Sequence, residues 1–286
     1  MKKILILGAN GMAGHVINLV LRDMPDKFIV TSIAKKHSKV PIDTLLDVTN
    51  FMKLSELIHI SKFDFIINCT GILNKKADSD FDQAILINSY LPHFLEKITQ
   101  NTSTKVIHLS TDCVFSGKSG DYKEGDFKDG IGVYALSKSL GEIENNKDLT
   151  IRTSIIGPEL HESGIGLFNW FMKQSGSSIY GFTKAFWSGV TTLELARILV
   201  DLMDIGELSG IVHVTSAKKI NKYDLITLFK QYFKNKDFII LEDRKHAVDK
   251  SLLNTRKDFK IEINSYDKMI SDLKIWINQH SSLYRY

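Results

Sequence analysis

Near its beginning the chain reads Lys3-Ile4-Leu5-Ile6-Leu7-Gly8-Ala9-Asn10-Gly11-Met12-Ala13-Gly14. Its apolar run predicts a buried strand, and apolar residues at helical spacing follow the glycines. Small residues at such a turn let the backbone approach a pyrophosphate, and the helix N-terminus offers free N–H groups. The segment therefore predicts a dinucleotide site, with the following cofactor-binding residues: Gly8, Asn10, Gly11, Met12 and Gly14.

The same alternation continues outward from this segment. Apolar runs at 28–33, 64–69, 105–110 and 149–153 alternate with helical patterns at 51–58, 81–100 and 134–146. This order predicts an α/β fold with a Rossmann-type doubly wound parallel sheet. We expect residues 1–155 to form the NADP-binding domain. Residues 156–286 should form mainly a smaller C-terminal α/β substrate lobe, with strands at 178–182 and 237–241 and a return to the sheet around 184–215.

The composition narrows the class of protein. The 286 residues are 43% hydrophobic and carry a formal net charge of +4 from scattered basic residues, which does not favour a nucleic-acid partner. No apolar stretch is long enough to cross a bilayer, so we expect no membrane partner. The two cysteines lack metal-ligand spacing, and the first apolar run is too short for a signal peptide. We expect a cytoplasmic protein without a metal and leave a homodimer open.

The end of the second expected strand bears on cofactor choice. It reads Ser32-Ile33-Ala34-Lys35-Lys36 and lacks the carboxylate that usually holds the ribose 2′-hydroxyl of NAD. Lys35 and Lys36 would instead attract a 2′-phosphate, so we expect NADP(H) to be preferred. NAD(H) stays an alternative, because short lysine runs are often solvated loops.

A second cofactor contact is expected after the apolar run 64–69. Cys69, Thr70 and Gly71 should lie at the carboxyl edge of the sheet, where ligands of open α/β sheets bind. Gly71 would let the backbone pass close to the cofactor. We expect Cys69 to be a small buried residue rather than a reactive thiol.

The candidate catalytic residues are Thr111, Tyr134 and Lys138. Tyr134 and Lys138 are four residues apart and share one face of the expected helix. An ammonium near the phenol should lower the pKa of Tyr134, so that the pair can exchange a proton with a carbonyl oxygen. Thr111 ends a strand, where its hydroxyl can polarise that carbonyl.

The residues of these motifs resemble those of one family. The GxxGxxG spacing is similar to that of extended short-chain dehydrogenase/reductases. Ser-Thr-Asp-x-Val-Phe-x-Gly from 110 and Tyr-x-x-Ser-Lys-x-x-Gly-Glu from 134 resemble dTDP-4-dehydrorhamnose reductases, and the likeness extends to 151–154 and 189–192. It implies NADPH-dependent reduction of a nucleotide-linked 4-keto-6-deoxy sugar for surface polysaccharide precursors, with the same catalytic triad. It also implies that Asp47 and Val48 lie by the adenine and that Asn88 lies near the catalytic lysine.

The resemblance also assigns a substrate site. Asp112 would lie beside the sugar, and the other expected contacts are Cys113, Val114, Arg152, His161 and Trp187. Arg152 would bind the nucleotide or pair with an internal carboxylate. Trp187 is chosen because it precedes the matching segment 189–192, although such aromatic residues are more often core.

Two departures from the family leave alternatives open. Cys113 stands where the family usually has Tyr, and segment 157–163 differs, so a UDP- or GDP-linked sugar remains a candidate. A bifunctional epimerase-reductase could use Cys113 with His161 as an acid/base pair. A non-catalytic NADP-binding regulatory subunit is a third interpretation. A dehydratase is disfavoured, because similar enzymes carry Glu at the position of Cys113.

Overall fold

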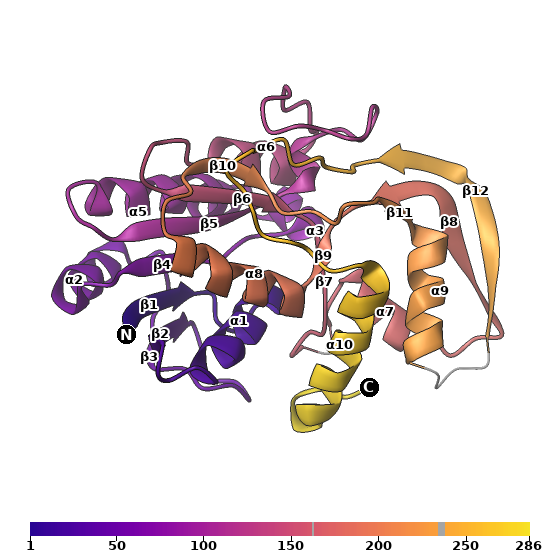
Figure 1. Cartoon of the computed structure of the whole chain (residues 1–286), viewed down its shortest axis with the longest axis horizontal. Helices are drawn as coiled ribbons and strands as arrows, with labels where there is room; N and C mark the ends of the chain where they lie inside the picture. The colour runs from indigo at the N-terminus through magenta and orange to yellow at the C-terminus, as the bar shows by residue number, and fades with distance from the viewer. Residues whose placement is uncertain (162, 234–237) are drawn as a thin grey trace.

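A computed structural model describes residues 1–161, 163–233 and 238–286 (Figure 1). Its main sheet has seven strands, and every neighbouring pair is parallel. Their order is β10 (Gly210–His213), β6 (Leu149–Thr153), β5 (Lys105–Thr111), β4 (Phe65–Asn68), β1 (Lys2–Leu7), β2 (Phe28–Ala34) and β3 (Thr44–Leu45). The order reverses between β1 and β4, which places a ligand crevice at their carboxyl ends. This arrangement confirms the predicted Rossmann-type sheet.

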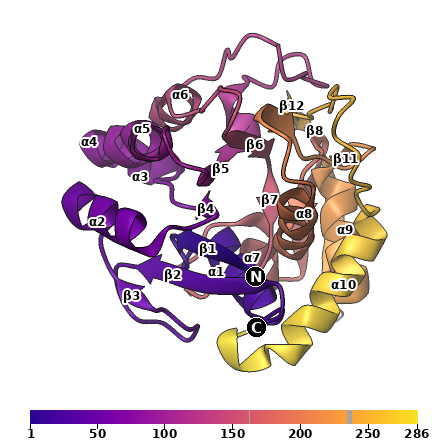
Figure 2. The same ribbon diagram turned by 60° about the vertical axis from the view of Figure 1, so that its left-hand side comes forward.

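Both faces of the sheet are covered by helices (Figure 2). Ile4 and Ile6 of β1 belong to an apolar cluster with α1 (Met12–Arg22) and α8 (Thr192–Ile205). Leu5 and Leu7 belong to a second cluster with α2 (Phe51–Ser61) and α5 (Leu91–Thr99). Alternate residues of a strand point to opposite faces, so a strand buried on both sides needs the uninterrupted apolar run seen in β1.

The helix expected over 81–100 is irregular. It consists of α4 (Phe81–Ala84), a π-helical turn η1 (Ile85–Tyr90) and α5. The neighbouring helix α6 (Val133–Leu140) is shorter than the 134–146 expected. It ends at Gly141, where a Cβ would lie only 1.8 Å from the Asn88 carbonyl oxygen. The close approach of these two segments requires glycine at that point, and α3 (Asn74–Ser79) lies beside them.

The C-terminal lobe contains a three-stranded sheet (Figure 1). Strand β8 (Ser178–Trp187) pairs in parallel with β12 (Ile239–Asp249) and antiparallel with β11 (Ile220–Asn221). Both long strands extend beyond the expected ranges, and Asp237 of the second range lies outside the described residues. Helices α7 (Leu167–Met172) and α9 (Lys222–Tyr232) accompany this sheet.

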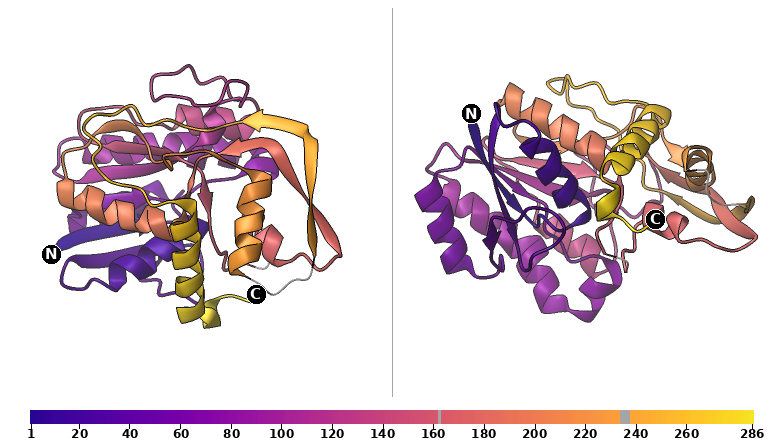
Figure 3. Two further views of the ribbon diagram at one scale, coloured as in Figure 1. Left: turned by 45° about the vertical axis from the view of Figure 1, so that its right-hand side comes forward. Right: turned by 90° about the horizontal axis from the view of Figure 1, so that it is seen from below.

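The two lobes lie against each other (Figure 3) and share one apolar core. The short strands β7 (Ile155–Ile156) and β9 (Val190–Thr191) pair at the junction, and α8 and β10 then bring the chain back to the main sheet. Helix α10 (Tyr266–Gln279) packs on α8 and α9 and is followed by η3 (Ser281–Leu283). One continuous apolar cluster therefore includes Ile4 of the main sheet and Phe229 of the C-terminal lobe. None of the helices in the described ranges is both long and apolar enough to span a bilayer.

Candidate active site

The glycine turn after β1 is built for close backbone approach. Gly8 has a φ of +80°, and a Cβ on Gly14 would lie 2.2 Å from the Gly8 carbonyl oxygen. Helix α1 therefore packs directly on the turn. Its N-cap is Gly11, which has no side chain to accept from the first N–H groups of the helix. These free donors and the positive end of the helix dipole fit a pyrophosphate.

Lys35 and Lys36 begin the loop after β2, next to the glycine turn. Lys35 forms an ion pair with Asp47, with 3.0 Å between Nζ and Oδ2, and both side chains are well exposed. Burial alone would raise the pKa of Asp47, but hydrogen bonds from Thr49 and Lys35 bring it below its ordinary value. The Asn10 amide donates to the Lys36 carbonyl oxygen at 2.8 Å, so the glycine turn and the lysine loop are tied together. Val48 is buried beneath α2.

A cavity of about 310 Å³ opens beside the glycine turn, at the carboxyl ends of the central strands. It brings together ten of the predicted site residues: Gly11, Met12, Cys69, Thr70, Gly71, Thr111, Asp112, Cys113, Tyr134 and Lys138. Sequence reasoning missed several further lining residues: Leu73, Asn74, Ser154, Ile155 and Leu195. Apart from Ser154, which ends the segment 151–154, these residues belong to no motif, so only the folded chain could show their place.

One wall of this cavity contains Thr111, Asp112, Cys113 and Tyr134. The Thr111 hydroxyl donates to Asp112 Oδ1 at 3.1 Å and accepts from the Cys113 N–H at 3.1 Å. Burial raises the pKa of the Tyr134 phenol, the charges of Cys113 and Asp112 add to this, and a hydrogen bond with Thr111 opposes it. The expected lowering of this pKa by Lys138 is not seen. The phenol is therefore a proton donor at neutral pH.

Lys138 is buried and is held from the side of β5. Its ammonium nitrogen donates to the Leu109 carbonyl oxygen at 2.6 Å and lies 3.2 Å from His108 Nε2. Burial lowers the pKa of Lys138 to about 8, although Glu142 and Cys69 act in the opposite direction. Sequence reasoning missed His108, because a histidine inside an apolar strand run gives no signal of its own.

The expected Asn88 connects the cofactor loop to the catalytic helix. Its Oδ1 accepts from the Ile72 N–H at 2.8 Å. Its Nδ2 donates to the Ile72 carbonyl oxygen at 2.9 Å and to Ser137 Oγ at 3.0 Å. Ser137 precedes Lys138, so Asn88 fixes the position of α6 relative to the loop after β4. The π-helical turn that holds Asn88 is a feature often found at functional sites.

The two cysteines are not activated. Burial raises the pKa of Cys69 to about 12, in line with its expected inert role. Burial, followed by the charge of Asp112, raises the pKa of Cys113 to about 11. His161 lines a different cavity with Lys39 and the C-terminal residues Leu283, Arg285 and Tyr286. The structure therefore does not bring the proposed epimerisation pair together.

Arg152 is a buried structural residue, which corrects its expected role in substrate binding. Its Nε and Nη2 donate to Glu142 Oε1 and Oε2 at 2.7 and 2.8 Å. Its Nη1 donates to the Glu124 carbonyl oxygen, and the side chain is 2% exposed. Of the two roles considered, the structure shows the internal carboxylate partner.

Trp187 and Val114 are also corrected. Trp187 is 3% exposed and packs in the core against Tyr266, with 5.6 Å between ring centroids. Val114 is 1% exposed and belongs to a small apolar cluster with Phe115 and Leu252. Neither side chain lines the cavity that holds Thr111 and Tyr134.

Two lysines that sequence reasoning missed approach Asp112 from the C-terminal lobe. Burial raises the pKa of Asp112, and the charges of Lys250 and Lys222 oppose this rise. Lys222 begins α9, and its nitrogen lies 5.9 Å from the centroid of the Trp187 ring. It also lines a neighbouring cavity of about 450 Å³ with several aromatic residues: Trp170, Tyr180, Phe182 and His246. This side of the site is therefore cationic and aromatic.

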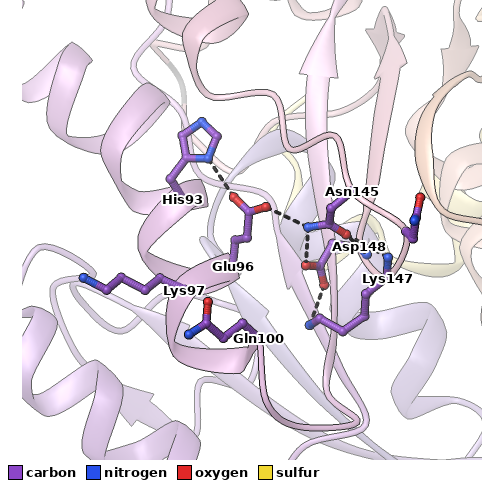
Figure 4. A pocket seen from close by; sticks show the side chains of 8 residues that line it. His93, Glu96, Lys97, Gln100, Asn145, Lys147 and Asp148 are labelled. Atoms are coloured by element: carbon purple, nitrogen blue, oxygen red, sulfur yellow. Dashed lines mark hydrogen bonds and ion pairs between the residues drawn. The ribbon is translucent and has the colours of Figure 1, made fainter.

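Another groove lies at the opposite edge of the sheet, before β6 (Figure 4). His93 Nδ1 bonds Glu96 at 2.8 Å, and Asn145 Nδ2 donates to Glu96 at 2.7 Å and to Asp148 at 3.0 Å. Lys147 pairs with Asp148 at 2.8 Å. These side chains form hydrogen bonds and an ion pair with one another, and they thereby connect α5 to the loop before β6. Across the ranges that the structure describes, no three His, Cys, Asp or Glu side chains gather as a metal site.

The fold and this cavity define a dinucleotide-binding α/β protein with the Thr, Tyr and Lys constellation of short-chain dehydrogenase/reductases. The chain belongs to the family described as RmlD substrate binding domain, whose model matches residues 1–237.

Named relatives agree with this family. The probable low-salt glycan biosynthesis reductase Agl14 of Haloferax volcanii is 28% identical over 233 residues, which is 77% of this chain and 76% of the relative. The dTDP-4-dehydrorhamnose reductase of Aggregatibacter actinomycetemcomitans is 26% identical over 81% of this chain and 79% of the relative. The crystal structure of dTDP-4-dehydrorhamnose reductase from Bacillus anthracis in complex with NADP has a TM-score of 0.80 at 21% identity. The structural match covers 96% of this chain and 99% of the neighbour, and it shows that the two share a fold.

Proposed function

We propose that this protein reduces the keto group of a nucleotide-linked 4-keto-6-deoxy sugar with NADPH, in the manner of a dTDP-4-dehydrorhamnose reductase. The observation that carries the proposal is the single cavity that places Thr111, Tyr134 and Lys138 beside the glycine turn. The relatives named as a glycan biosynthesis reductase and a dehydrorhamnose reductase support the reaction class and a role in glycan biosynthesis. We propose that the product is a precursor of a surface polysaccharide.

The chain's own residues fit a dinucleotide. Gly8 and Gly14 leave the space that a Cβ would fill, and Gly11 exposes the start of α1. Lys35 and Lys36 would hold a 2′-phosphate, and NADP in the Bacillus anthracis neighbour supports this preference. When bound, the nicotinamide supplies a hydride to the carbonyl carbon.

Three polar residues of the cavity have a role in this reduction. The Thr111 hydroxyl donates a hydrogen bond to the sugar carbonyl oxygen and polarises it. The Tyr134 phenol, kept protonated by burial, gives its proton to that oxygen as the C–H bond forms. The charged form of Lys138 would hold the ribose hydroxyls of the cofactor.

The substrate would extend from this cavity into the C-terminal lobe. Lys222 and Lys250 supply positive charge next to Asp112, where the diphosphate of a sugar nucleotide would pass. The aromatic cavity beyond Lys222 would take the nucleoside.

A panel of keto-sugar nucleotides tests the function. The purified protein should convert at least one of the dTDP-, UDP- and GDP-4-keto-6-deoxy sugars to a product two mass units heavier, with one NADPH oxidised per product. Absence of turnover with every member would favour the binding-subunit interpretation.

Lys35→Glu and Lys36→Glu should each raise KM for NADPH and leave KM for NADH nearly unchanged. An unaltered NADPH preference would reject the lysine assignment.

We also propose a homodimer. Four large apolar side chains that are at least half exposed lie on the contacting segments α4, η1 and α6: Phe81, Tyr90, Leu136 and Leu140. A grouped apolar surface of this kind is typical of an interface. Sedimentation equilibrium should give a dimer that Leu136→Lys dissociates, whereas Ile60→Lys at an isolated exposed position of α2 should not. A monomeric wild-type protein would contradict this.

A further inference from the structure

We propose that His108 is a positioning residue whose fixed ring tautomer controls the charge of Lys138. The inference deepens the proposed function, because it concerns the lysine that the reduction uses. It rests on a buried chain of hydrogen bonds that runs from Thr70 through Asn68 and His108 to Lys138. Asn68 and His108 are fully buried, and Lys138 is 3% exposed.

The orientation of the Asn68 amide is set by Thr70. The Thr70 N–H and hydroxyl both donate to Asn68 Oδ1, at 3.1 and 2.6 Å. The amide nitrogen of Asn68 therefore faces His108 Nδ1, at 3.1 Å. An amide nitrogen can only donate, so Nδ1 must accept, and the single proton of the neutral imidazole lies on Nε2.

This tautomer presents an N–H to Lys138. His108 Nε2 lies 3.2 Å from Lys138 Nζ, and an ammonium has no lone pair to accept from it. The contact is favourable only when Lys138 is a neutral amine, which accepts from His108 and still donates to the Leu109 carbonyl oxygen at 2.6 Å. His108 cannot relieve the conflict by taking a second proton, because burial and the charge of Lys138 hold its pKa well below the ordinary value.

The other ionisable groups that face Lys138 do not cancel the preference for a neutral amine that the contact with His108 creates. Cys69, beyond β4, stays a neutral thiol because burial raises its pKa to about 12. Glu142, beyond the end of α6, favours the ammonium, but its carboxylate is bound by Arg152. Tyr134, on the same helix, is protonated. His108 is thus the group that opposes the ammonium by direct contact from β5.

The consequence is a charge switch near neutral pH. Burial lowers the pKa of Lys138 to about 8, so the ammonium is lost as pH rises through that value instead of near 10.5. The proposed reaction uses the charged form, so kcat/KM should fall on the alkaline side of about 8. A partner that accepts from Lys138 should move this fall to higher pH.

The tautomer can be measured without any substrate. In the full-length protein with ¹⁵N-labelled histidine, two-bond proton–nitrogen correlations should show His108 as the Nε2–H tautomer, unchanged across the neutral pH range. The signal is assigned by its loss in His108→Gln. An Nδ1–H tautomer, or a ring that titrates in that range, would overturn the proposal and would leave the reductase function untouched.

The pH profile provides a second test, which a merely packing role of His108 would not satisfy. His108→Gln can turn an amide oxygen to Lys138, and Asn68→Asp accepts from Nδ1–H and frees Nε2 to accept. Both variants should shift the alkaline limb of kcat/KM upward by about one pH unit. His93→Gln is the matched control, because the His93 ring bonds Glu96 and the Leu140 carbonyl oxygen and is not part of the chain from Thr70 to Lys138, so it should leave the limb in place. Folded variants with an unshifted limb would refute the role. If both variants fail to fold, the wild-type tautomer still decides.

Discussion

The guanidinium of Arg152 donates two hydrogen bonds, 2.7 and 2.8 Å long, to the carboxylate of Glu142 within the protein interior. Ser110, one residue before Thr111, donates to the same carboxylate at 2.8 Å. The pair thereby braces the end of β5, where the catalytic hydroxyl is carried. The pair lies outside the cavity lining and supports its wall, and Glu142 also favours the charged form of Lys138.

Removal of one charge of this pair should be costly. Arg152→Met removes the two-point partner of the buried Glu142 carboxylate, which keeps its contacts with Lys128 and Ser110, so the free energy of unfolding in urea should fall by up to about 3–5 kcal/mol. Arg244→Met breaks a well-exposed pair with Glu242 and should change it by less than about 1 kcal/mol. Equal effects of the two substitutions would contradict the structural role.

The same pair predicts a pH dependence of stability. Burial alone would raise the pKa of Glu142, but the hydrogen bonds and charge of Arg152 bring it below the ordinary 4.5. A carboxyl with a lowered folded pKa stabilises above its unfolded value, and that contribution is lost as pH falls through the folded value. Wild-type stability should therefore drop below about pH 4.5 more steeply than that of Arg152→Met, as measured by urea unfolding at several pH values.

The glycine turn predicts a steric effect on cofactor binding. A Cβ on Gly14 would lie 2.2 Å from the Gly8 carbonyl oxygen, so Gly14→Ala must push α1 away from the turn. We expect NADPH affinity, followed by fluorescence titration, to fall by at least about tenfold, which corresponds to 1.4 kcal/mol. Gly125→Ala is the control, since a Cβ there meets nothing within 4 Å. Unchanged binding in Gly14→Ala would argue against a pyrophosphate at this turn.

The lysines of the C-terminal lobe predict a separable effect on substrate binding. Lys222→Met and Lys250→Met should each raise KM for the sugar nucleotide by about tenfold with a smaller change in kcat, because the diphosphate is bound equally in ground and transition states. Lys219 is paired with Asp121 and Asp249, so Lys219→Met serves as the control. A fall in kcat at constant KM would place these lysines elsewhere in the reaction.

Cys113 should be dispensable for reduction. With its pKa raised to about 11 by burial and then by Asp112, the thiol is uncharged at neutral pH and is a poor base for a sugar C–H. Cys113→Ser should keep kcat within about threefold of wild type. Product formed in D₂O should carry no deuterium at C3 or C5. Wash-in that disappears in Cys113→Ser would show epimerase activity and revise this view.

Much of the fold follows from the sequence, because strands buried on both faces require uninterrupted apolar runs such as Ile4–Leu7. The cavity around Thr111, Tyr134 and Lys138 follows too, since the carboxyl ends of parallel strands meet at one edge. Helix boundaries were less predictable. The early end of α6 depends on contact between Gly141 and Asn88, which lie far apart in sequence.

The site residues that were predicted wrongly or missed share a physical reason. Arg152 and Trp187 have side chains suited to ligands, but their exposure is decided by packing across strands and lobes that no local pattern encodes. Lys222 and Lys250 reach the site only because the C-terminal lobe folds back onto it. His108 was hidden for the opposite reason: its strand context is apolar, and its function depends on the amide orientation of Asn68.

In the proposed reaction, hydride reaches a sugar carbonyl while Tyr134 supplies the proton. The direct measurement is single turnover of NADPH deuterated at the transferred C4 position with a 4-keto-6-deoxy sugar nucleotide, followed by mass spectrometry of the sugar. We predict one deuterium on the former carbonyl carbon, and in Tyr134→Phe a rate lower by about 10²–10⁴-fold with nearly unchanged NADPH binding. An unlabelled sugar, or a Tyr134→Phe variant as fast as wild type, would contradict the account.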